Sequence, residues 1–511
     1  MTISPKHTRV LLRATLFAVL LAVVSHTRAD PDLFGNVRFG SDVIAARSAV
    51  VPDAYSFTSS GTFINHEWLS EAILSLAFAA AGASGLIIVK LLLLVVTGIA
   101  IVVALSHAGV RDTQADMLVA IAAVTTFPQT NQIRAQLFSL ALFACVLLTL
   151  TATARKPRAA LWLIPIMAVW PNLHGGWIVA AGTLGAWCAV GLLRNRRDRR
   201  ARTTWSTVGA ATAAIVATIA NPWGWRMWTF LYGTVGVNRS DIRDWQPPFQ
   251  LGPMYGLLWL LAAVVAVAGF AAALSRRSID WRAVAVVTML GAASSRVNRL
   301  TAFFALSAIV LLGPPLAAWL EQARAARPVR VPGRLAAMIT AVVAAVVIAG
   351  AAAVSARNLS CISMEPDLFP EPELVSVVRN LSLHGRVLNW FDYGHYAIWH
   401  FSPALRVSID GRRETLYSKE VIDRHLAFYF DPDTRNAAID ALAPDYIWMP
   451  SRLAVTDRLI ADGWNPLFRG PQSTLLSRPS NPLNLVNPLN PLNPLNPLNP
   501  LNLGSRCFPG P

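Results

Sequence analysis

The chain has 511 residues, of which 54% are hydrophobic and only 14% are charged, and its mean hydropathy is +0.46. This composition excludes a single soluble domain and is typical of a protein that crosses a membrane many times. The formal net charge of +16 does not indicate nucleic-acid binding, because the basic residues are concentrated in short connectors between apolar runs.

The first apolar run lies close to the N-terminus. Its uninterrupted core, Ala14 to Ser25, follows Lys6, Arg9 and Arg13, so it fits either a membrane span or the apolar region of a signal peptide. We expect an uncleaved first span or signal-anchor over residues 1–28, because Arg28 fits poorly before a cleavage site. In either case the chain emerges outside the membrane, and residues 29–70 form an external loop.

A helix bundle is predicted for residues 71–355. Long apolar runs at 86–107, 135–154, 174–193, 204–220, 253–274, 300–319 and 335–355 approach or reach the roughly 20 residues that cross a bilayer, and shorter runs lie at 71–84, 115–127, 159–170 and 282–296. The basic connectors at 155–158, 194–200 and 321–334 are then cytoplasmic, and the C-terminal region is external. The count of crossings agrees at both ends only if the run at 115–127 dips into the membrane or lies at its interface, which leaves about 11 spans.

Residues 356–480 have the composition of a soluble domain. Short buried strands are predicted at 386–390, 405–410 and 445–449, and helices around 418–430, 435–442 and 453–462. The fold class is thus mainly α, a polytopic membrane helix bundle with a small external α/β C-terminal domain of about 120 residues.

The last segment, 481–511, is predicted to be a disordered tail. The triplet Asn-Pro-Leu recurs between Asn481 and Asn502, and proline at every third position prevents helix and sheet. Of the four cysteines, Cys361 and Cys507 are expected outside the membrane, but no disulfide framework or zinc spacing is recognised.

Two acids of the external loop are the best candidates for catalysis. Asp32 directly follows the first span and Glu67 abuts the second, so anchored helix ends would hold both carboxylates near the bilayer surface. A carboxylate there can activate an acceptor hydroxyl, or two can bind a divalent cation such as Mg²⁺ or Mn²⁺, although no ligand spacing requires a metal. Helix capping or a solvated loop position is the alternative for these acids, and His66 is a base, a metal ligand or an interfacial residue beside Trp68.

Arginines on the external side indicate a phosphate site. Arg296 and Arg299 separate two apolar runs where the positive-inside rule gives no reason for basic residues, and Arg134 follows the same pattern. Guanidinium groups at this depth suit a phosphate because each forms bidentate, charge-assisted hydrogen bonds, whereas contact with ordinary lipid headgroups is the alternative. Trp245 and Gln246 are suited to stacking a sugar ring and binding its hydroxyls, whereas a place in the interfacial aromatic belt is the alternative for Trp245.

Several motifs together resemble a known group. They are Asp32, Asp53-x-x-Ser56-x-Thr58, His66-Glu67-Trp68-Leu69, Arg134-x-Gln136, Asn172-Leu173-His174-Gly175-Gly176, Asn221-Pro222-x-Gly224-Trp225, Arg296-x-x-Arg299, Asp392-Tyr393-Gly394-His395-Tyr396 and Ile409-Asp410-Gly411-Arg412. This order looks like bacterial membrane proteins grouped with the GT-C glycosyltransferases, over residues 30–478. Many such proteins carry aromatic residues and a histidine directly after the first acid, where this chain has Leu33-Phe34-Gly35-Asn36.

The resemblance implies an inverting transferase of the bacterial inner membrane that uses a polyprenyl-phosphate-linked sugar and an external glycan, lipid or protein acceptor. Asp32 matches the acidic position of the first external loop, and Glu67 matches a second acid of some relatives. Sugar or acceptor binding is expected of Asp53, His174, Trp245, Gln246 and His395, whereas Asp392, Asp410 and Arg412 either bind polar substrate groups or stabilise turns. Two alternatives remain open: a lipid or solute transporter, and a non-catalytic envelope assembly protein.

Overall fold

The structure is a computed structural model that describes residues 5–59, 63–194, 200–234, 239, 242–325, 334–431, 433–479 and 506–510. The chain divides into two compact units. The first comprises Met1–Thr27 and Ile87–Ser360, and the second comprises Arg28–Leu86 and Cys361–Pro511. The central part of the basic connectors (195–199 and 326–333) and the Asn-Pro-Leu repeat lie outside the described residues.

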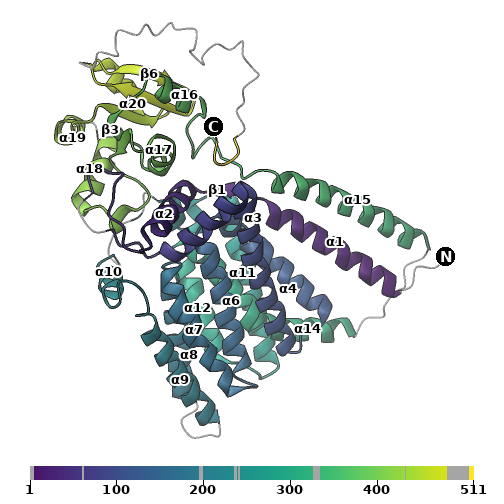
Figure 1. The fold of residues 1–511 in the computed structure, drawn as a ribbon. Helices are drawn as coiled ribbons and strands as arrows, with labels where there is room; N and C mark the ends of the chain where they lie inside the picture. The colour runs from purple at the N-terminus through teal and green to yellow at the C-terminus, as the bar shows by residue number, and fades with distance from the viewer. Residues whose placement is uncertain are drawn as a thin grey trace. The chain divides into compact units, whose positions relative to one another are not determined.

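The first unit is built from helices (Figure 1). Each apolar run that predicts a span or a shorter membrane segment in this unit is helical, because a helix satisfies its own backbone hydrogen bonds in an apolar environment. In chain order the elements are α1 (Pro5–Ser25), the end of α3 (Trp68–His107), α4 (Asp112–Thr125), α5 (Phe127–Thr130), β2 (Gln132–Ile133), α6 (Gln136–Ala152), η1 (Pro157–Trp162), α7 (Leu163–Val169), η2 (Trp170–Asn172), α8 (Trp177–Arg194), α9 (Arg200–Ala217), α10 (Arg226–Thr234), η3 (Arg243–Trp245), η4 (Pro248–Gln250), α11 (Pro253–Ser275), α12 (Trp281–Ser294), η5 (Asn298–Leu300), α13 (Thr301–Ser307), the π-helical η6 (Ala308–Leu312), α14 (Gly313–Ala325) and α15 (Arg334–Leu359).

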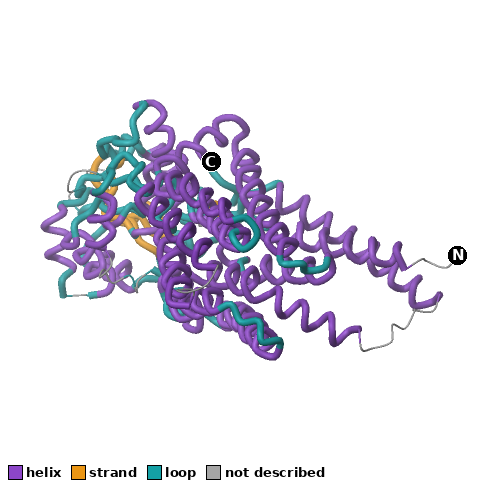
Figure 2. The backbone as a smooth tube through the Cα atoms, turned by 90° about the horizontal axis from the view of Figure 1, so that it is seen from below, coloured by secondary structure: helices purple, strands orange, loops and turns teal. Residues whose placement is uncertain are grey.

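Five helical segments among the described residues are long and apolar enough to cross a membrane: Trp68–His107, Trp177–Arg194, Pro253–Ser275, Asn298–Arg324 and Met338–Leu359. The helices Gln136–Ala152 and Trp281–Ser294 are apolar but shorter. These segments mark the chain as a membrane protein, and the total of about 11 crossings stays a prediction. The first and last helices of this unit, α1 and α15, pack along each other (Figures 1 and 2).

The second unit begins with a helix that the sequence analysis does not predict. Within the external loop, α2 (Asp32–Ala46) follows the two-residue strand β1 (Arg28–Ala29) and buries Leu33, Phe34, Val37 and Val43. It packs closely on the start of α3, where a Cβ atom added to Gly40 would lie 2.0 Å from the carbonyl oxygen of Glu71. Further along, α3 departs from helical geometry at Ala81 and Gly82.

The rest of this unit is the predicted α/β domain, whose strands gather in one region of Figure 2. Its sheet has the strand order β4-β3-β5-β7-β6, with β3 parallel to β4 and β5, and β7 antiparallel to β5 and β6. The strands are β3 (Gly385–Asn389), β4 (Leu405–Val407), β5 (Tyr446–Pro450), β6 (Asn465–Arg469) and β7 (Ser473–Ser477); the helices are α16 (Glu373–Asn380), η7 (Phe391–Tyr393), α17 (Gly394–Phe401), η8 (Arg413–Thr415), α18 (Lys419–Phe430), α19 (Arg435–Leu442) and α20 (Ala454–Ala461).

Part of the external loop extends this sheet. Ser56 pairs with Val407 in the parallel sense, the amide of Phe57 donates to the Val407 carbonyl at 3.1 Å, and the amide of Val407 donates to the Tyr55 carbonyl at 3.0 Å. The Arg406 side chain donates to the Ser56 carbonyl at 2.7 Å. The loop residues before the second apolar run therefore belong to the edge of the C-terminal domain.

The described end of the chain corrects one expectation. Cys361 and Cys507 form a disulfide across a sequence separation of 146 residues, although the sequence analysis recognises no disulfide framework. Residues 506–510 lie inside the segment predicted to be a disordered tail, and they pair with the start of the C-terminal domain through the bridge between Ser363 and Cys507.

Candidate functional site

Asp32 is the first residue of α2. The Asp30 side chain accepts a hydrogen bond from the Asp32 amide at 3.0 Å, and the Asp30 carbonyl accepts one from the Leu33 amide, so Asp30 satisfies the start of the helix. A carboxylate in the first helical turn is stabilised by the helix dipole. The capping role that the sequence leaves open for acids near the spans is therefore taken by Asp30, which leaves the Asp32 side chain available for other contacts.

Asp32 meets a histidine of the C-terminal domain. Oδ1 of Asp32 lies 3.1 Å from Nδ1 of His395, which stands on α17 just after β3. The Asp32 side chain is 49% exposed, whereas that of His395 is 5% exposed. One end of this pair is thus open to a substrate and the other is fixed inside the domain.

A buried chain of charges continues from His395. Nε2 of His395 lies 3.3 Å from Oδ1 of Asp410, and Asp410 is bound by two nitrogens of Arg412 at 2.9 and 2.7 Å. Arg412 also pairs with Asp53 at 2.7 Å, and its guanidinium lies over the rings of Phe39, Tyr55 and Phe63. Burying a guanidinium is tolerated here because two carboxylates and aromatic faces replace its water shell.

Asp53 joins the external loop to the C-terminal domain. Its side chain is only 2% exposed, and its carboxylate also accepts hydrogen bonds from the amides of Tyr55 and Ser56 at 3.2 and 3.1 Å. Together with the ion pair to Arg412, these contacts tie the loop to the domain. Sugar or acceptor binding by Asp53 stays a prediction, as do the two roles expected of Asp410 and Arg412.

The charges around His395 change its protonation. Burial lowers the pKa of His395, but the carboxylates of Asp32 and Asp410 outweigh this effect and raise it to about 9. Burial likewise opposes ionisation of Asp410, yet Arg412 and His395 hold the pKa of that carboxyl well below its usual range. At neutral pH an imidazolium therefore bridges two carboxylates, and it fixes the position of Asp32.

Two glycines make room for this pair. A Cβ atom at Gly411 would lie 2.0 Å from Oδ1 of Asp32 and 2.5 Å from Cε1 of His395. A Cβ atom at Gly35 would lie 2.7 Å from the His395 ring. All three distances are shorter than real contacts, so a side chain at either position would displace Asp32 or His395.

The second candidate acid lies where the external loop meets α3. Oε1 of Glu67 is 3.4 Å from Nε2 of His66, and both side chains are about one-fifth exposed (22% and 23%). The amide of Glu67 donates to the Asn65 side chain at 3.1 Å. One turn further on, Glu71 is buried and accepts a hydrogen bond from the amide group of Asn65. Glu71 is not among the predicted site residues, because it lies inside an apolar run.

In the first unit, residues from four separate connectors converge. Arg134 pairs with Asp244 at 2.7 Å, and Nη2 of Arg299 lies 2.9 Å from Nε2 of His174. The other ring nitrogen of His174, Nδ1, lies 2.7 Å from the Ser139 hydroxyl. Burial raises the pKa of Asp244, but Arg134 and Arg299 outweigh this effect and lower it overall. We call Arg134, His174, Asp244, Trp245 and Arg299 the arginine cluster.

The same cluster contains the predicted sugar-stacking residue. The guanidinium of Arg299 lies 5.9 Å from the centroid of the Trp245 ring, and that of Arg239 lies 4.5 Å from it. The amide of Asn298 donates to the Gln246 carbonyl at 3.0 Å, which joins η3 to η5. Arg296 differs from the other arginines: it is exposed, and its guanidinium makes no hydrogen bond or ion pair with any residue that the structure describes.

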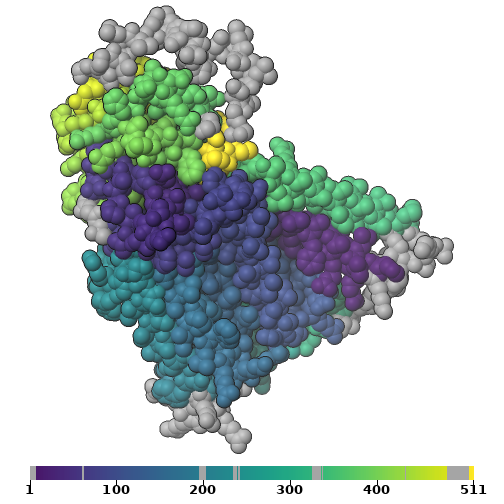
Figure 3. Space-filling view, viewed as in Figure 1, coloured from purple at the N-terminus to yellow at the C-terminus, as the bar shows by residue number. Residues whose placement is uncertain are grey.

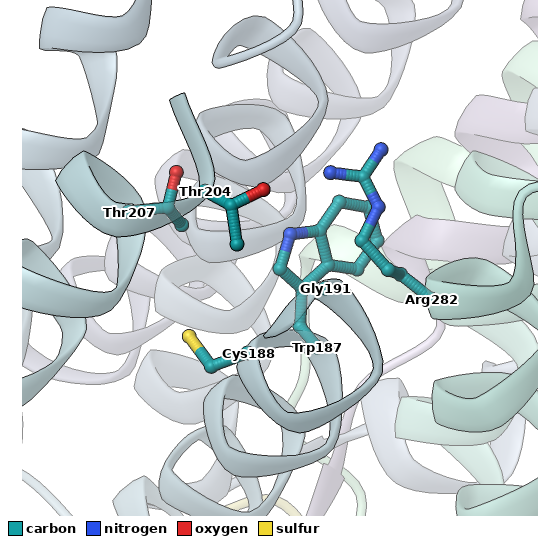
Figure 4. A pocket seen from close by; sticks show the side chains of 6 residues that line it. All are labelled: Trp187, Cys188, Gly191, Thr204, Thr207 and Arg282. Atoms are coloured by element: carbon teal, nitrogen blue, oxygen red, sulfur yellow. The ribbon is translucent and has the colours of Figure 1, made fainter. Parts of the chain in front are cut away.

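Two hollows lie away from these residues. A small cavity of about 10 Å³ between α8, α9 and α12 is lined by Trp187, Cys188, Gly191, Thr204, Thr207 and Arg282 (Figure 4). It holds no more than a single water, so it is a packing gap. A wider hollow of about 370 Å³ in the C-terminal domain is lined partly by Arg379, His384 and His400.

No group of three or more His, Cys, Asp or Glu side chains that could hold a metal ion occurs within the described ranges.

Comparison with solved structures shows a likeness over nearly the whole chain. ArnT from Cupriavidus metallidurans bound to undecaprenyl phosphate has a TM-score of 0.55 and 12% identity, covering 96% of this chain and 99% of that one. The apo form of that protein gives 0.53 and 13%, with 93% and 98% covered. The oligosaccharyltransferase from Archaeoglobus fulgidus in complex with Zn and sulfate gives 0.50 and 11%, with 86% and 68% covered.

No protein-family model and no curated protein matches the chain. At these low identities the likeness to the solved structures is one of fold. It confirms the fold class that the sequence predicts: a membrane helix bundle with an α/β C-terminal domain.

Proposed function

We propose that the chain is an integral membrane glycosyltransferase that moves a sugar from a polyprenyl-phosphate donor to an external acceptor with inversion at the anomeric carbon. The observation that carries this proposal is the half-exposed Asp32 carboxylate, fixed on its inner side by the buried imidazolium of His395. A carboxylate held in this way can accept a proton from an approaching hydroxyl without first having to be ordered. The fold, shared with ArnT bound to undecaprenyl phosphate, supports the class of donor.

In the proposed step, a hydroxyl oxygen of the acceptor attacks the anomeric carbon from the face opposite the phosphate. The new glycosidic bond forms while the bond between the anomeric carbon and the phosphate oxygen breaks, and Asp32 takes the hydroxyl proton. The lipid phosphate leaves as an anion. A single displacement of this kind inverts the configuration at that carbon, as the sequence resemblance implies.

Arg296 and Arg299 are the proposed phosphate ligands. The Arg296 guanidinium is exposed, and Nη2 of Arg299 lies 2.9 Å from Nε2 of His174. Guanidinium groups bind phosphate through charge-assisted hydrogen bonds. Arg134 fits this role less well, because Asp244 already neutralises it at 2.7 Å. We assign Arg134 to holding the arginine cluster together, and Trp245 remains the proposed sugar platform.

The C-terminal domain is proposed to lie on the periplasmic side of the inner membrane. The Cys361–Cys507 disulfide supports this side, because disulfides persist in oxidising compartments such as the bacterial periplasm and are rare in the cytosol. The basic connectors expected on the opposite side agree with this orientation.

Sugar transfer from a panel of radiolabelled polyprenyl-phosphate sugars tests the proposal. The assay uses the purified full chain in lipid nanodiscs, with candidate glycan, lipid and peptide acceptors, in the presence and absence of Mg²⁺ or Mn²⁺. We expect product from the wild type and a loss of at least about 100-fold for Asp32→Asn, the size of effect typical of a general base. Arg296→Gln should weaken donor binding more than it slows turnover.

Two results would contradict this function. Donor that crosses the membrane of a proteoliposome without being cleaved would indicate a transporter. If no donor is consumed but an Asp32→Asn strain keeps an intact envelope that a deletion strain lacks, the chain is an assembly protein without catalysis. A signal that appears only with added cation would show that transfer requires a divalent metal.

A further inference from the structure

The described end of the chain is held against the second unit by covalent and backbone bonds. Besides the Cys361–Cys507 disulfide, the Met364 amide donates to the Arg506 carbonyl at 2.7 Å, and the Phe508 amide donates to the Ile362 carbonyl at 2.9 Å. Figure 3 shows the segment in yellow at the surface. Residues that follow the low-complexity repeat therefore have a fixed place in the fold.

The side chain next to the disulfide is buried among aromatic rings. Phe508 is only 2% exposed, and its ring centroid lies 4.7 Å from that of Phe34, 5.6 Å from that of Phe78 and 5.9 Å from that of Trp399. Phe34 belongs to α2, Phe78 to α3 and Trp399 to α17. One ring from the end of the chain thus packs against three helices of the second unit.

Two of these helices carry the candidate catalytic pair. Phe34 follows Asp32 by two residues on α2, and Trp399 follows His395 by four residues, about one helical turn, on α17. Phe34 also contacts Trp399 edge-on at 6.0 Å. The Phe508 ring fills the space beside Phe34 and Trp399. It therefore fixes the separation of α2 and α17, because packed interiors transmit small displacements rather than absorb them.

We propose that Phe508, anchored by the Cys361–Cys507 disulfide, is a positioning residue that holds Asp32 against His395. It touches neither of them and acts through Phe34 and Trp399. The inference rests on the proposed function only in giving Asp32 its catalytic role. Oxidation of the two cysteines then sets the activity of the site, so that the chain becomes competent only after its C-terminal segment is bonded in place.

His395 supplies a readout that does not depend on activity. Asp32 and Asp410 face its ring directly, while Glu71 and Arg412 act on the same network through their charges. If Asp32 moves away, the imidazolium loses one of the two carboxylates that stabilise it. Its pKa should then fall from about 9 by about 1 to 3 units.

The experiment measures this pKa by NMR on full-length protein labelled at histidine, in nanodiscs. The variants are Cys507→Ser, Phe508→Ala and Phe508→Leu, with Asp32→Asn as the reference for a lost carboxylate. Phe428→Ala is the matched control, because Phe428 is a buried phenylalanine (1% exposed) that packs in the separate cluster around Leu388, Ile447 and Leu459. Thermal melting of each variant reports stability.

We expect Cys507→Ser, Phe508→Ala and chemically reduced wild type to lower the pKa of His395 in the direction of Asp32→Asn, and Phe508→Leu to recover part of the shift. Phe428→Ala should lower the melting temperature but leave this pKa unchanged. Transfer activity should fall with the pKa.

If the Phe508 variants have a lower melting temperature but an unchanged pKa of His395, Phe508 has only a structural role and the proposal is overturned. A shifted pKa together with no transfer by any form, wild type included, would uphold the positioning and refute the proposed function instead. Should Cys507→Ser fail to fold, reduction of folded wild type, with thiols counted by mass spectrometry, decides the same question.

Discussion

Arg412 is the central charge of the buried network, and replacing it with methionine tests whether that network joins the external loop to the C-terminal domain. The substitution keeps an unbranched apolar chain beside Phe39 and Phe63 but removes the cation shared by Asp53 and Asp410. Both carboxylates then remain buried without their common partner, at 2% and 0% exposure.

The stability cost of Arg412→Met depends on which hydrogen bonds Asp53 and Asp410 retain. Removing one partner of a buried ion pair destabilises a protein by about 3 to 5 kcal/mol. Asp53 retains the amides of Tyr55 and Ser56, and Asp410 retains the Tyr417 hydroxyl at 2.6 Å. These remaining hydrogen bonds place the cost at the lower end, about 3 kcal/mol, which is roughly a 100-fold increase in opening of this region.

Hydrogen–deuterium exchange followed by mass spectrometry measures that opening in peptides covering residues 53–59 and 405–412. Arg38→Met is the matched control. Its guanidinium also lies over Tyr55, but it is 42% exposed and 3.9 Å from Asp42, so its loss should cost less than about 1 kcal/mol. The double variant Asp53→Asn/Arg412→Met should recover part of the loss. Equal protection in wild type and Arg412→Met would refute the network as the joint between the two segments.

Three further predictions concern the candidate site. Folding raises the pKa of His395, so its ionisation stabilises the protein fully below about pH 6.5, and this stabilisation is lost as the pH rises through about 9. The melting temperature of the wild type should therefore fall between these pH values, and that of His395→Gln should change less. Gly411→Ala should push Asp32 away from His395, lower the free energy of unfolding by about 1 to 3 kcal/mol through overpacking, and slow sugar transfer. Thermal melting and the transfer assay measure these effects, and full activity would contradict the close approach of Gly411 to Asp32. Arg134→Gln should lower the melting temperature more than Arg296→Gln, because it leaves the Asp244 carboxylate without its ion pair; an equal effect would assign Arg134 to the phosphate instead.

The membrane part of the fold follows from the sequence because its signals are local. Each apolar run predicts a helix through length alone, and the structure places α6, α8, α11 and α15 within a few residues of the expected bounds. Strands β3, β4 and β5 are predicted by short runs of branched and aromatic residues, and the structure confirms them. The antiparallel strands β6 and β7 lack comparable apolar runs and are not predicted.

Helix α2 shows why the candidate site is harder to predict. Gly35, Asn36 and Gly40 are poor helix formers, yet each is nearly or fully buried, and the glycines allow α2 to approach His395 and Glu71. Tertiary contacts therefore override local propensity at this segment. The i, i+4 spacing of Leu33 and Val37 is the helical signal that the sequence contains.

The pairing of distant residues is the second limit. Asp32 and His395 are separated by most of the chain, and no spacing rule connects a loop acid to a histidine after a strand. The position of Asp410 after β4 offered a hint, because side chains that follow parallel strands meet at one edge of a sheet. The disulfide could also have been inferred, since Cys361 and Cys507 are the two cysteines expected outside the membrane.

Asp32, fixed by His395, is proposed to be the base of a sugar transfer. Its most direct test is the rate of sugar transfer from a polyprenyl-phosphate donor by Asp32→Asn, compared with wild type and with Asp367→Asn, an exposed acid of the same unit. We expect a loss of at least about 100-fold for Asp32→Asn while the variant stays folded, and none for Asp367→Asn. Transfer at the wild-type rate by folded Asp32→Asn would contradict it.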